Sequence, residues 1–368
     1  MARALILGGG AIGRGFLPWS FEDLPFDIYD ASEALCQIMA ERGGYSSFMS
    51  VEGELLEKKF CPDYASSKFG DFNLDNYDIV FIAVGPRNCA NLPPALAKFG
   101  GPIFSIENDP NTVKIIKEGL GIGNVYFGVP DVIASSTASP SNLAKDPLSL
   151  HTEDGVLYLE DSASVGEEIK PHLPNVQWVT QEKLSQEWDA KLFLHNTPHC
   201  ISAYLGFMWG RNYVHEGFSN SFVTRVVEGV IEELVLALKR STKHNHDFLE
   251  SYADKELRRF SNELLFDPIS RVAREPLRKL APGGRLMGAL SMCLLSGVNP
   301  VHLGAGIAAA LSYHDPSDRD YKSMQYLKHL EIKDFLRYFL EIMPDSLESR
   351  FVSKTHNDAL QFLKLGLS

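Results

Sequence analysis

Residues 191–199 read KLFLHNTPH, which combines a lysine, an asparagine and two histidines with apolar residues. On a helix these four polar side chains could line one side of a cleft, although Pro198 would distort the turn. A lysine shielded from water has a lowered pKa and can accept a hydroxyl proton. An asparagine amide can donate to the developing alkoxide, and a histidine can orient the same oxygen. Lys191, Asn196 and His199 therefore fit the chemistry of alcohol oxidation.

Spacing alone leaves two other interpretations open. In the first, Lys191 extends to solvent, Asn196 caps a turn and His199 is a hydrogen-bonded core residue. In the second, His195 and His199, four residues apart, bind zinc. Position 196 is not the glutamate of an HExxH motif, and the five scattered cysteines form no matching cluster. We therefore predict no metal site.

A glycine turn near the N-terminus follows an expected strand and precedes an expected helix. Its Gly8, Gly10 and Gly13 have GxGxxG spacing, with Ala11 and Ile12 between them. The first glycine permits a tight turn, the second lets a pyrophosphate approach the backbone, and the third allows close helix–strand packing. We predict that the whole turn, Ala11 and Ile12 included, binds a dinucleotide.

The cofactor choice rests on an acid that closes the next expected strand, residues 26–32. Asp30 lies 22 residues after Gly8, where its carboxylate can accept bonds from the adenosine ribose hydroxyls. Its charge would repel a 2′-phosphate, and the residues that follow it supply no arginine. NAD is therefore favoured over NADP.

Composition narrows the class of protein. The 368 residues carry a net charge of −12, with no long basic run, which argues against a nucleic-acid or anionic-membrane partner. The odd number of unpaired cysteines is typical of a reduced, cytoplasmic protein. The apolar stretch 286–314 is interrupted at residues 296–300, so we expect two buried helices rather than a membrane span.

The elements change character near residue 180. Before it, expected strands at 26–32, 77–86 and 101–109 alternate with helix-like segments, which predicts a doubly wound, mostly parallel sheet of Rossmann type with a β-rich insertion. After it, long amphipathic helices dominate. We therefore predict an NAD-binding domain over residues 1–180 and a mainly α-helical substrate domain over residues 181–368.

The second half also contains a basic segment, RVAREPLRKLAPGGRL. We call its five cations, Arg271, Arg274, Arg278, Lys279 and Arg285, the basic block. Guanidinium groups suit bidentate phosphate binding. The same residues could instead pair with the surplus carboxylates or cap helix ends.

Several segments in order along the chain resemble the polyol-specific long-chain dehydrogenases, most closely their mannitol-1-phosphate 5-dehydrogenase branch. The matching segments are GGGAIGRGF, AVGP, IEN, KLFLHNTPH, AYLG, RRFSN, RVAREPLRKL and GIAAALSY. The resemblance implies a metal-independent, NAD-dependent oxidoreductase. Its small-molecule substrate pair would be of the mannitol 1-phosphate and fructose 6-phosphate type, and its active site would lie in a cleft between the two domains.

The resemblance also implies roles for matching residues. Lys191 would be the general base in oxidation and the acid in reduction, His199 would position the hydroxyl, and Asn196 and Asn108 would stabilise the oxyanion. Val84 and Gly85 of AVGP, with Asn108, would add to the cofactor site. The substrate phosphate would contact Arg274, Arg278 and Lys279.

The chain departs from the family at two places. Ser135 and Ser136 stand where the family carries an Asp-Arg pair near the substrate, and Pro198 replaces a small residue before His199. Two alternatives accompany the main prediction. The GGGAIG start and the helical second half also fit a ketopantoate-reductase-like NAD(P)H enzyme, and the serines at 135 and 136 favour a non-catalytic dinucleotide-binding sensor. We expect a monomer or a homodimer.

Overall fold

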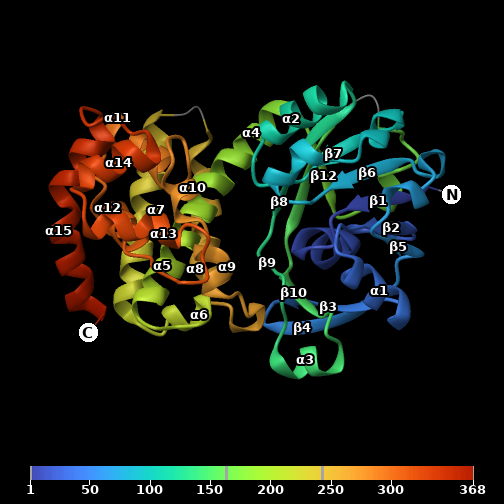
Figure 1. The fold of residues 1–368 in the computed structure, drawn as a ribbon, viewed down its shortest axis with the longest axis horizontal. Coiled ribbons are helices and arrows are strands. Elements are labelled where there is room, and N and C mark those ends of the chain that lie inside the picture. The colour runs from blue at the N-terminus through green and yellow to red at the C-terminus, as the bar shows by residue number, and fades with distance from the viewer. Residues whose placement is uncertain (1, 162–164, 242–243, 368) are drawn as a thin grey trace. The chain divides into compact units, whose positions relative to one another are not determined.

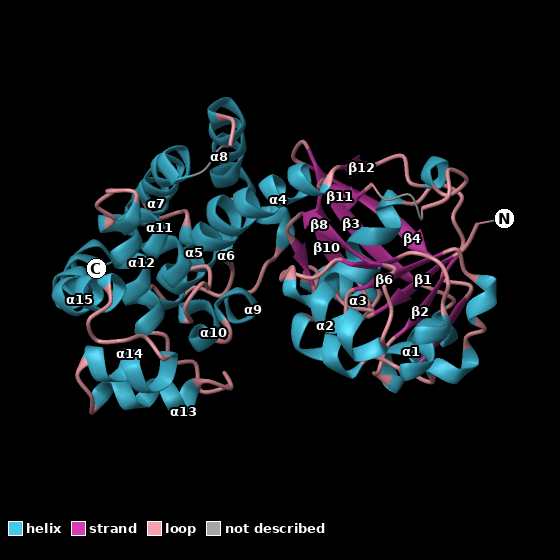
Figure 2. Ribbon diagram, turned by 90° about the horizontal axis from the view of Figure 1, so that it is seen from above, coloured by secondary structure: helices cyan, strands magenta, loops and turns pink. Residues whose placement is uncertain are grey.

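The computed structural model describes residues 2–161, 165–241 and 244–367 as two compact units (Figure 1). The first comprises Met1–Glu187 with Leu264–Phe266, and the second comprises Trp188–Glu263 with Asp267–Ser368. Helix α4 (Gln181–Ala190) begins in the first unit and ends in the second. The strands gather in the first unit, and the described part of the second consists of helices and loops (Figure 2).

The first unit is built on an eight-stranded sheet of order β12-β11-β8-β7-β6-β1-β2-β5. All neighbouring strands are parallel except β8 and β11. The predicted doubly wound, mostly parallel sheet is confirmed. The strands are β1 (Ala4–Leu7), β2 (Phe26–Tyr29), β5 (Tyr64–Ser66), β6 (Ile79–Ile82), β7 (Ile103–Ser105), β8 (Val125–Asp131), β11 (Val156–Glu160) and β12 (Val176–Val179).

The central strand β1 shows why this sheet needs cover on both faces. Ile6 packs into one hydrophobic core with Phe81, whereas Leu5 packs into a second core with Val80. Such continuous apolar strands are typical of parallel sheets buried on both sides. Helices α1 (Glu33–Arg42), α2 (Asn111–Leu120) and α3 (Pro140–Lys145) complete this unit.

The predicted β-rich insertion, residues 45–66, contributes two strands, β3 and β4, to a second sheet of order β4-β3-β10-β9. Its strands are β3 (Tyr45–Val51), β4 (Glu54–Phe60), β9 (Ala134–Ser135) and β10 (Leu150–Glu153). The third strand of the inserted segment, β5, instead pairs with β2 at the edge of the large sheet.

In the second unit, α5 (Thr197–Met208) is almost entirely buried, and α12 (Val301–Leu311) packs against it. A Cβ at Gly306 would lie 2.5 Å from Ile201 Cδ1, so this glycine permits the close approach of the two helices. The apolar stretch 286–314 contains α11 (Met287–Leu295) and α12, the two buried helices expected. The other helices are α6 (Val214–Gly217), α7 (Ser221–Ser241), α8 (His246–Phe260), α9 (Ile269–Ala273), α10 (Pro276–Leu280), α13 (Tyr321–Met324), α14 (Ile332–Leu340) and α15 (Leu347–Leu367).

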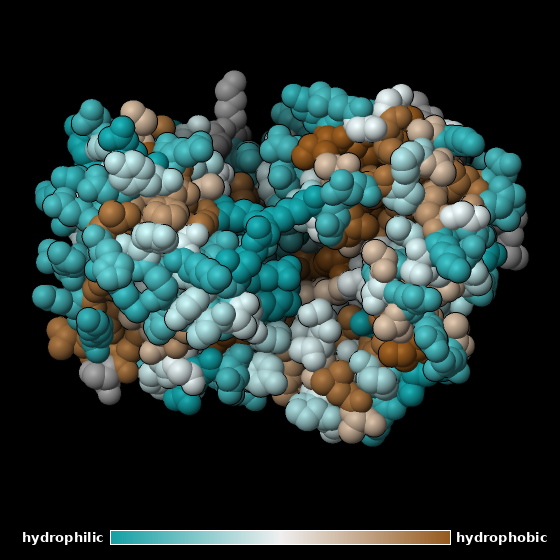
Figure 3. All heavy atoms as spheres, in the orientation of Figure 1, coloured by the Kyte–Doolittle hydropathy of each residue, from teal (hydrophilic) through white to brown (hydrophobic). Residues whose placement is uncertain are grey.

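The surface of the second unit is mostly hydrophilic on the face that Figure 3 shows, with some apolar area beside the C-terminal end of α15. The side chain of Leu365 in that helix is 80% exposed. Across the described ranges, no helix has both the length and the apolar composition that a membrane span needs.

The three residues Leu264–Phe266, which we call the strap, return from the second unit to the first. The Leu264 carbonyl oxygen lies 2.5 Å from Nδ1 of His151, and the Ser135 hydroxyl donates to the Phe266 carbonyl at 3.3 Å. Phe266 has φ +47°, a left-handed conformation that is uncommon for a residue with a side chain. The chain therefore crosses between the units three times, whereas the predicted domains, divided at residue 180, have one crossing.

Candidate functional site

The glycine turn after β1 is packed tightly on one side and open on the other. Gly8 has φ +104°, and a Cβ there would lie 2.4 Å from the Ala83 carbonyl oxygen. A Cβ at Gly13 would lie 1.8 Å from the Gly8 carbonyl oxygen, whereas a Cβ at Gly10 would meet nothing within 4 Å in the described structure. The turn therefore leaves room for a phosphate beside the backbone of Gly10, and it fits a dinucleotide.

The Arg14 side chain hydrogen-bonds to the backbone of the glycine turn. The segment Ala11–Phe16, which contains Gly13, is a π-helical turn, and a 3-10 turn rather than a regular α-helix follows it. The buried Arg14 side chain donates from Nε to the Gly9 carbonyl at 2.7 Å and also bonds to the Leu148 carbonyl. Burial lowers the pKa of this guanidinium. Arg14 is not among the predicted site residues, because nothing in its local sequence shows that the side chain turns inward.

Asp30, directly after β2, bonds to the glycine turn itself. Its Oδ2 accepts the Gly9 N–H at 2.7 Å, and its Oδ1 accepts the Ser32 N–H at 2.8 Å. A carboxylate oxygen has a second lone pair, so both can still accept from ribose hydroxyls. Asp30 therefore lies beside the glycine turn, and its contact with a cofactor ribose stays a prediction.

The remaining predicted cofactor residues follow β6 and β7. Val84 and Gly85 come after β6, and Asn108 is exposed after β7. Between them lies Glu107, a buried residue that sequence analysis missed, whose Oε1 accepts the Gly85 N–H at 2.7 Å. Burial raises the pKa of Glu107 to about 7.

These segments lie at the carboxyl ends of four neighbouring strands, β2, β1, β6 and β7. Open α/β sheets bind ligands at that edge, where the strand order reverses. The glycine turn, the acid and the loops after β6 and β7 are thus brought together in the first unit.

Three of the four predicted catalytic residues lie on one helical stretch of the second unit. Lys191, Asn196 and His199 are 2%, 5% and 7% exposed. Residues Lys191–Asn196 form a π-helical turn between α4 and α5, and Pro198 stands in the first turn of α5. The helix is thus distorted beside this proline, as predicted. Asn108, the fourth residue, belongs to the first unit.

The amide of Asn196 is a donor without an acceptor. Its Nδ2 is buried and has no hydrogen-bond partner among the described residues. A buried polar group in that state costs free energy unless another molecule supplies the partner. Asn196 is therefore suited to donate to a bound oxygen.

His195 belongs to a buried network in which its Nδ1 donates to Glu256 Oε2 at 2.6 Å. The second oxygen of Glu256 accepts from Arg259 at 2.5 Å. Burial holds the pKa of His195 well below its usual value, so the ring is neutral. The His195 and His199 ring centroids are 5.2 Å apart. Because the Nδ1 atom of His195 is bonded to Glu256, this network fixes the orientation of the His195 ring beside His199.

His199 is fixed on two sides. Its ring stacks on Phe260 with centroids 5.1 Å apart, and its Nε2 lies 3.1 Å from Asp267 Oδ2. This is an ion-pair distance, but neither atom has a well-directed hydrogen bond in the described structure. The other Asp267 oxygen binds Arg271 at 2.6 Å. Burial lowers the pKa of His199, and Asp267 opposes that shift.

The members of the basic block have different surroundings. Arg271 and Arg278 pair with Asp267 and Glu275, and the buried Lys279 ammonium donates to the Arg274 carbonyl. The Arg274 side chain is exposed, and Arg285 is half-buried. Of the three predicted phosphate contacts, Lys279 is thus already bonded within the protein.

Ser135 and Ser136, the positions at which the resemblance leads one to expect an Asp-Arg pair, have unlike surroundings. Ser135 is fully buried in β9 and bonds to the strap, whereas Ser136 is exposed. Ser135 therefore helps to anchor the strap in the first unit.

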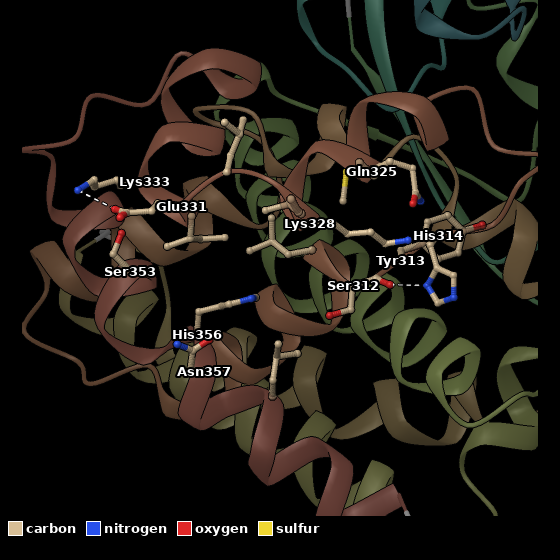
Figure 4. Close-up of a pocket in the computed structure, with 16 residues that line it drawn as sticks. Ser312, Tyr313, His314, Gln325, Lys328, Glu331, Lys333, Ser353, His356 and Asn357 are labelled. Atoms are coloured by element: carbon tan, nitrogen blue, oxygen red, sulfur yellow. Dashed lines mark hydrogen bonds and ion pairs between the residues drawn. The ribbon is translucent and has the colours of Figure 1, made fainter.

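A cavity of about 640 Å³ lies elsewhere in the second unit, among segments 311–333 and 353–360 (Figure 4). Lys328, His314 and His356 line it with serine, asparagine and aliphatic side chains. None of the predicted site residues lines this cavity.

The fold and the glycine turn define a Rossmann-type nucleotide-binding protein with a helical second unit. Residues 186–337 match the mannitol dehydrogenase C-terminal domain. The chain therefore carries that domain, and the predicted resemblance to this group of dehydrogenases is confirmed, together with the predicted class of enzyme, an oxidoreductase.

Two relatives are similar along most of their length. The mannitol-1-phosphate 5-dehydrogenase of Exiguobacterium sp. is 27% identical over 339 residues, which cover 86% of this chain and 87% of the relative. The mannitol-1-phosphate 5-dehydrogenase of Caldanaerobacter subterraneus subsp. tengcongensis is 26% identical over 372 residues, which cover 90% of this chain and 92% of the relative.

Among solved structures, the ternary complex of Pseudomonas fluorescens mannitol 2-dehydrogenase with NAD and D-mannitol superposes with a TM-score of 0.79. The match covers 100% of this chain and 93% of that one at 16% identity. It confirms the predicted fold class.

Proposed function

We propose that this chain is an NAD-dependent oxidoreductase that interconverts a polyol phosphate and a ketose phosphate of the mannitol 1-phosphate and fructose 6-phosphate type. The observation that carries the proposal is the burial of Lys191, Asn196 and His199 on one helical stretch of a mannitol dehydrogenase C-terminal domain. The names of the two bacterial relatives support a phosphorylated substrate. The glycine turn and Asp30 support NAD, which the mannitol 2-dehydrogenase complex also contains.

The glycine turn and Asp30 would hold NAD, which would supply the hydride acceptor for oxidation of the carbinol carbon and the hydride donor for the reverse reduction. Lys191 accepts the hydroxyl proton during oxidation and gives it back during ketone reduction. The Asn196 amide donates to the oxygen as negative charge develops there, because this donor has no acceptor among the described residues. His199 orients the same oxygen with a ring that Phe260 and Asp267 hold. Asn108 stays a prediction for the second oxyanion donor.

The test is NADH oxidation with fructose 6-phosphate, compared with free fructose and other ketose phosphates. Lys191→Met should lose turnover at least about 1000-fold while NADH binding, measured by fluorescence, is retained. Lys354→Met, at an exposed position of α15, is the matched control and should keep full activity. Tight NADH binding without turnover of any ketose would contradict the proposal and support the sensor alternative. Full activity of Lys191→Met would contradict the role of the lysine.

A further inference from the structure

The basic block contains one half-buried cation that has no acidic partner among the described residues. Arg271 and Arg278 form ion pairs, Lys279 bonds to a carbonyl, and Arg274 faces solvent. The side chain of Arg285 forms no ion pair or hydrogen bond with the described residues. Removing a guanidinium from water is unfavourable unless an anion compensates for it.

Arg285 is nevertheless held firmly by its backbone. Its carbonyl accepts the Thr197 hydroxyl at 2.7 Å, and the next residue, Leu286, donates its N–H to the Lys279 carbonyl at 3.0 Å. Thr197 lies between Asn196 and Pro198 at the start of α5. The backbone of Arg285 is therefore fixed beside the helical stretch that carries the candidate catalytic residues.

The charges around Arg285 are unfavourable for it. Burial lowers the pKa of its guanidinium, and the nearby Arg278 and Arg271 act in the same direction. The neutral Cys200 and Tyr204 side chains of α5 are also close enough to interact with it. Arginine remains charged under these conditions, so the local excess of positive charge persists without a ligand.

Asn196, Cys200 and Tyr204 are spaced four residues apart and so form one stripe of the helix. Arg285 interacts with the second and third members of this stripe, and the first carries the buried Nδ2 that has no acceptor. Two donors that lack acceptors are thus associated with the same stripe. A ketose phosphate would satisfy both, with its reacting oxygen at Asn196 and its phosphate at Arg285.

We propose that Arg285 binds the phosphate dianion of the substrate and thereby selects phosphorylated over free ketoses. This deepens the proposed function and rests on it for the identity of the ligand. It assigns the main phosphate contact to Arg285 rather than to Arg274 or Lys279. The half-buried side chain retains access for a ligand, and arginine can bind two phosphate oxygens at once.

The experiment compares Arg285→Met with Arg274→Met in kinetics with fructose 6-phosphate and free fructose. Arg285→Met should raise KM for fructose 6-phosphate about 10- to 100-fold and change that for fructose less than about twofold. Arg337→Met, on the exposed face of α14, is a control for loss of an arginine. A large KM increase in Arg274→Met with none in Arg285→Met would overturn the assignment.

A binding measurement separates this inference from the proposed function. Inorganic phosphate in excess should raise the thermal midpoint of the wild type by about 2–4 °C and leave that of Arg285→Met unchanged. Without phosphate, the variant should melt at a higher temperature than the wild type, because it lacks a desolvated cation. If no ketose is turned over but the phosphate shift depends on Arg285, the anion site stands and the proposed reaction fails. An equal phosphate shift in both proteins contradicts the anion site.

Discussion

The imidazole Nε2 of His199 lies 3.1 Å from the carboxylate of Asp267, and both side chains are buried. Arg271 binds the other oxygen of that carboxylate at 2.6 Å. An Asp-Arg pair is therefore present next to the candidate catalytic histidine. Asp267 directly follows the strap and Arg271 lies in α9, whereas the resemblance leads one to expect such a pair at positions 135 and 136.

Asp267→Asn should lower kcat/KM about 10- to 100-fold, because the neutral amide orients His199 less strongly. Burial lowers the pKa of His199, and the Asp267 charge opposes this effect. Loss of that charge should lower the pKa further and shift a His199-dependent limb of the pH–rate profile to lower pH. NADH affinity should not change. An unaltered pH profile with reduced kcat would show that Asp267 has only a packing role.

Glu107→Gln should change how stability depends on pH. Burial raises the pKa of Glu107 from 4.5 to about 7. Between these values the folded protein binds more protons at this site than the unfolded chain, so the wild type loses stability as pH rises from 4.5 to 7. The loss attributable to this group is at most about 3 kcal/mol.

The glutamine variant lacks this titration and should gain stability relative to wild type at pH 8 compared with pH 5. Urea unfolding at the two pH values measures the difference. The glutamine oxygen can still accept the Gly85 N–H, so the loop after β6 should be preserved. Equal pH dependence in the two proteins would show that Glu107 is not responsible.

Arg14→Met should weaken NADH binding about tenfold, because the Gly9 peptide loses the donor that orients it. It should also destabilise the fold by about 2–4 kcal/mol, since two carbonyls lose a buried partner. Arg42→Met is the matched control: Arg42 donates to the Lys145 carbonyl but is 41% exposed. A weaker Kd for NADH in Arg42→Met than in Arg14→Met would refute the positioning role.

Ser135→Asp, which introduces the acid of the family's pair, should not increase activity. The fully buried hydroxyl donates to the Phe266 carbonyl, and a carboxylate would place an acceptor against an acceptor. We expect a loss of about 2–4 kcal/mol in the free energy of unfolding. Ser136→Arg, at an exposed position, should lower the free energy of unfolding by less than about 0.5 kcal/mol. Higher activity without destabilisation in Ser135→Asp would contradict the anchoring role of Ser135.

The residues of the candidate cofactor site could be identified from the sequence because their signals are local. The glycines, the strand before them and Asp30 lie within a single stretch of 30 residues, and each requires a particular backbone conformation. The buried helices of segment 286–314 were likewise evident from an interrupted apolar run. Arg14 and Glu107 were missed because their inward orientation depends on the surrounding packing.

The surroundings of the candidate catalytic residues were not predictable in the same way. Glu256 and Asp267 follow His195 and His199 by 61 and 68 residues, in segments whose acids look like ordinary surface charges. A single sequence gives no sign of which distant acid meets which histidine. The basic block was visible, but which of its members lacks a partner depends on the fold.

The strap has a consequence for how this protein can be divided or recombined. A gene fragment that stops at Glu187 encodes a sheet in which His151 and Ser135 lack the Leu264 and Phe266 carbonyls that they bond. A fragment that starts at Trp188 carries those carbonyls without the sheet. The two parts are therefore not interchangeable modules. In a chimera with either part from a distant relative, the strap of one protein would have to fit the side chains at positions 135 and 151 of the other.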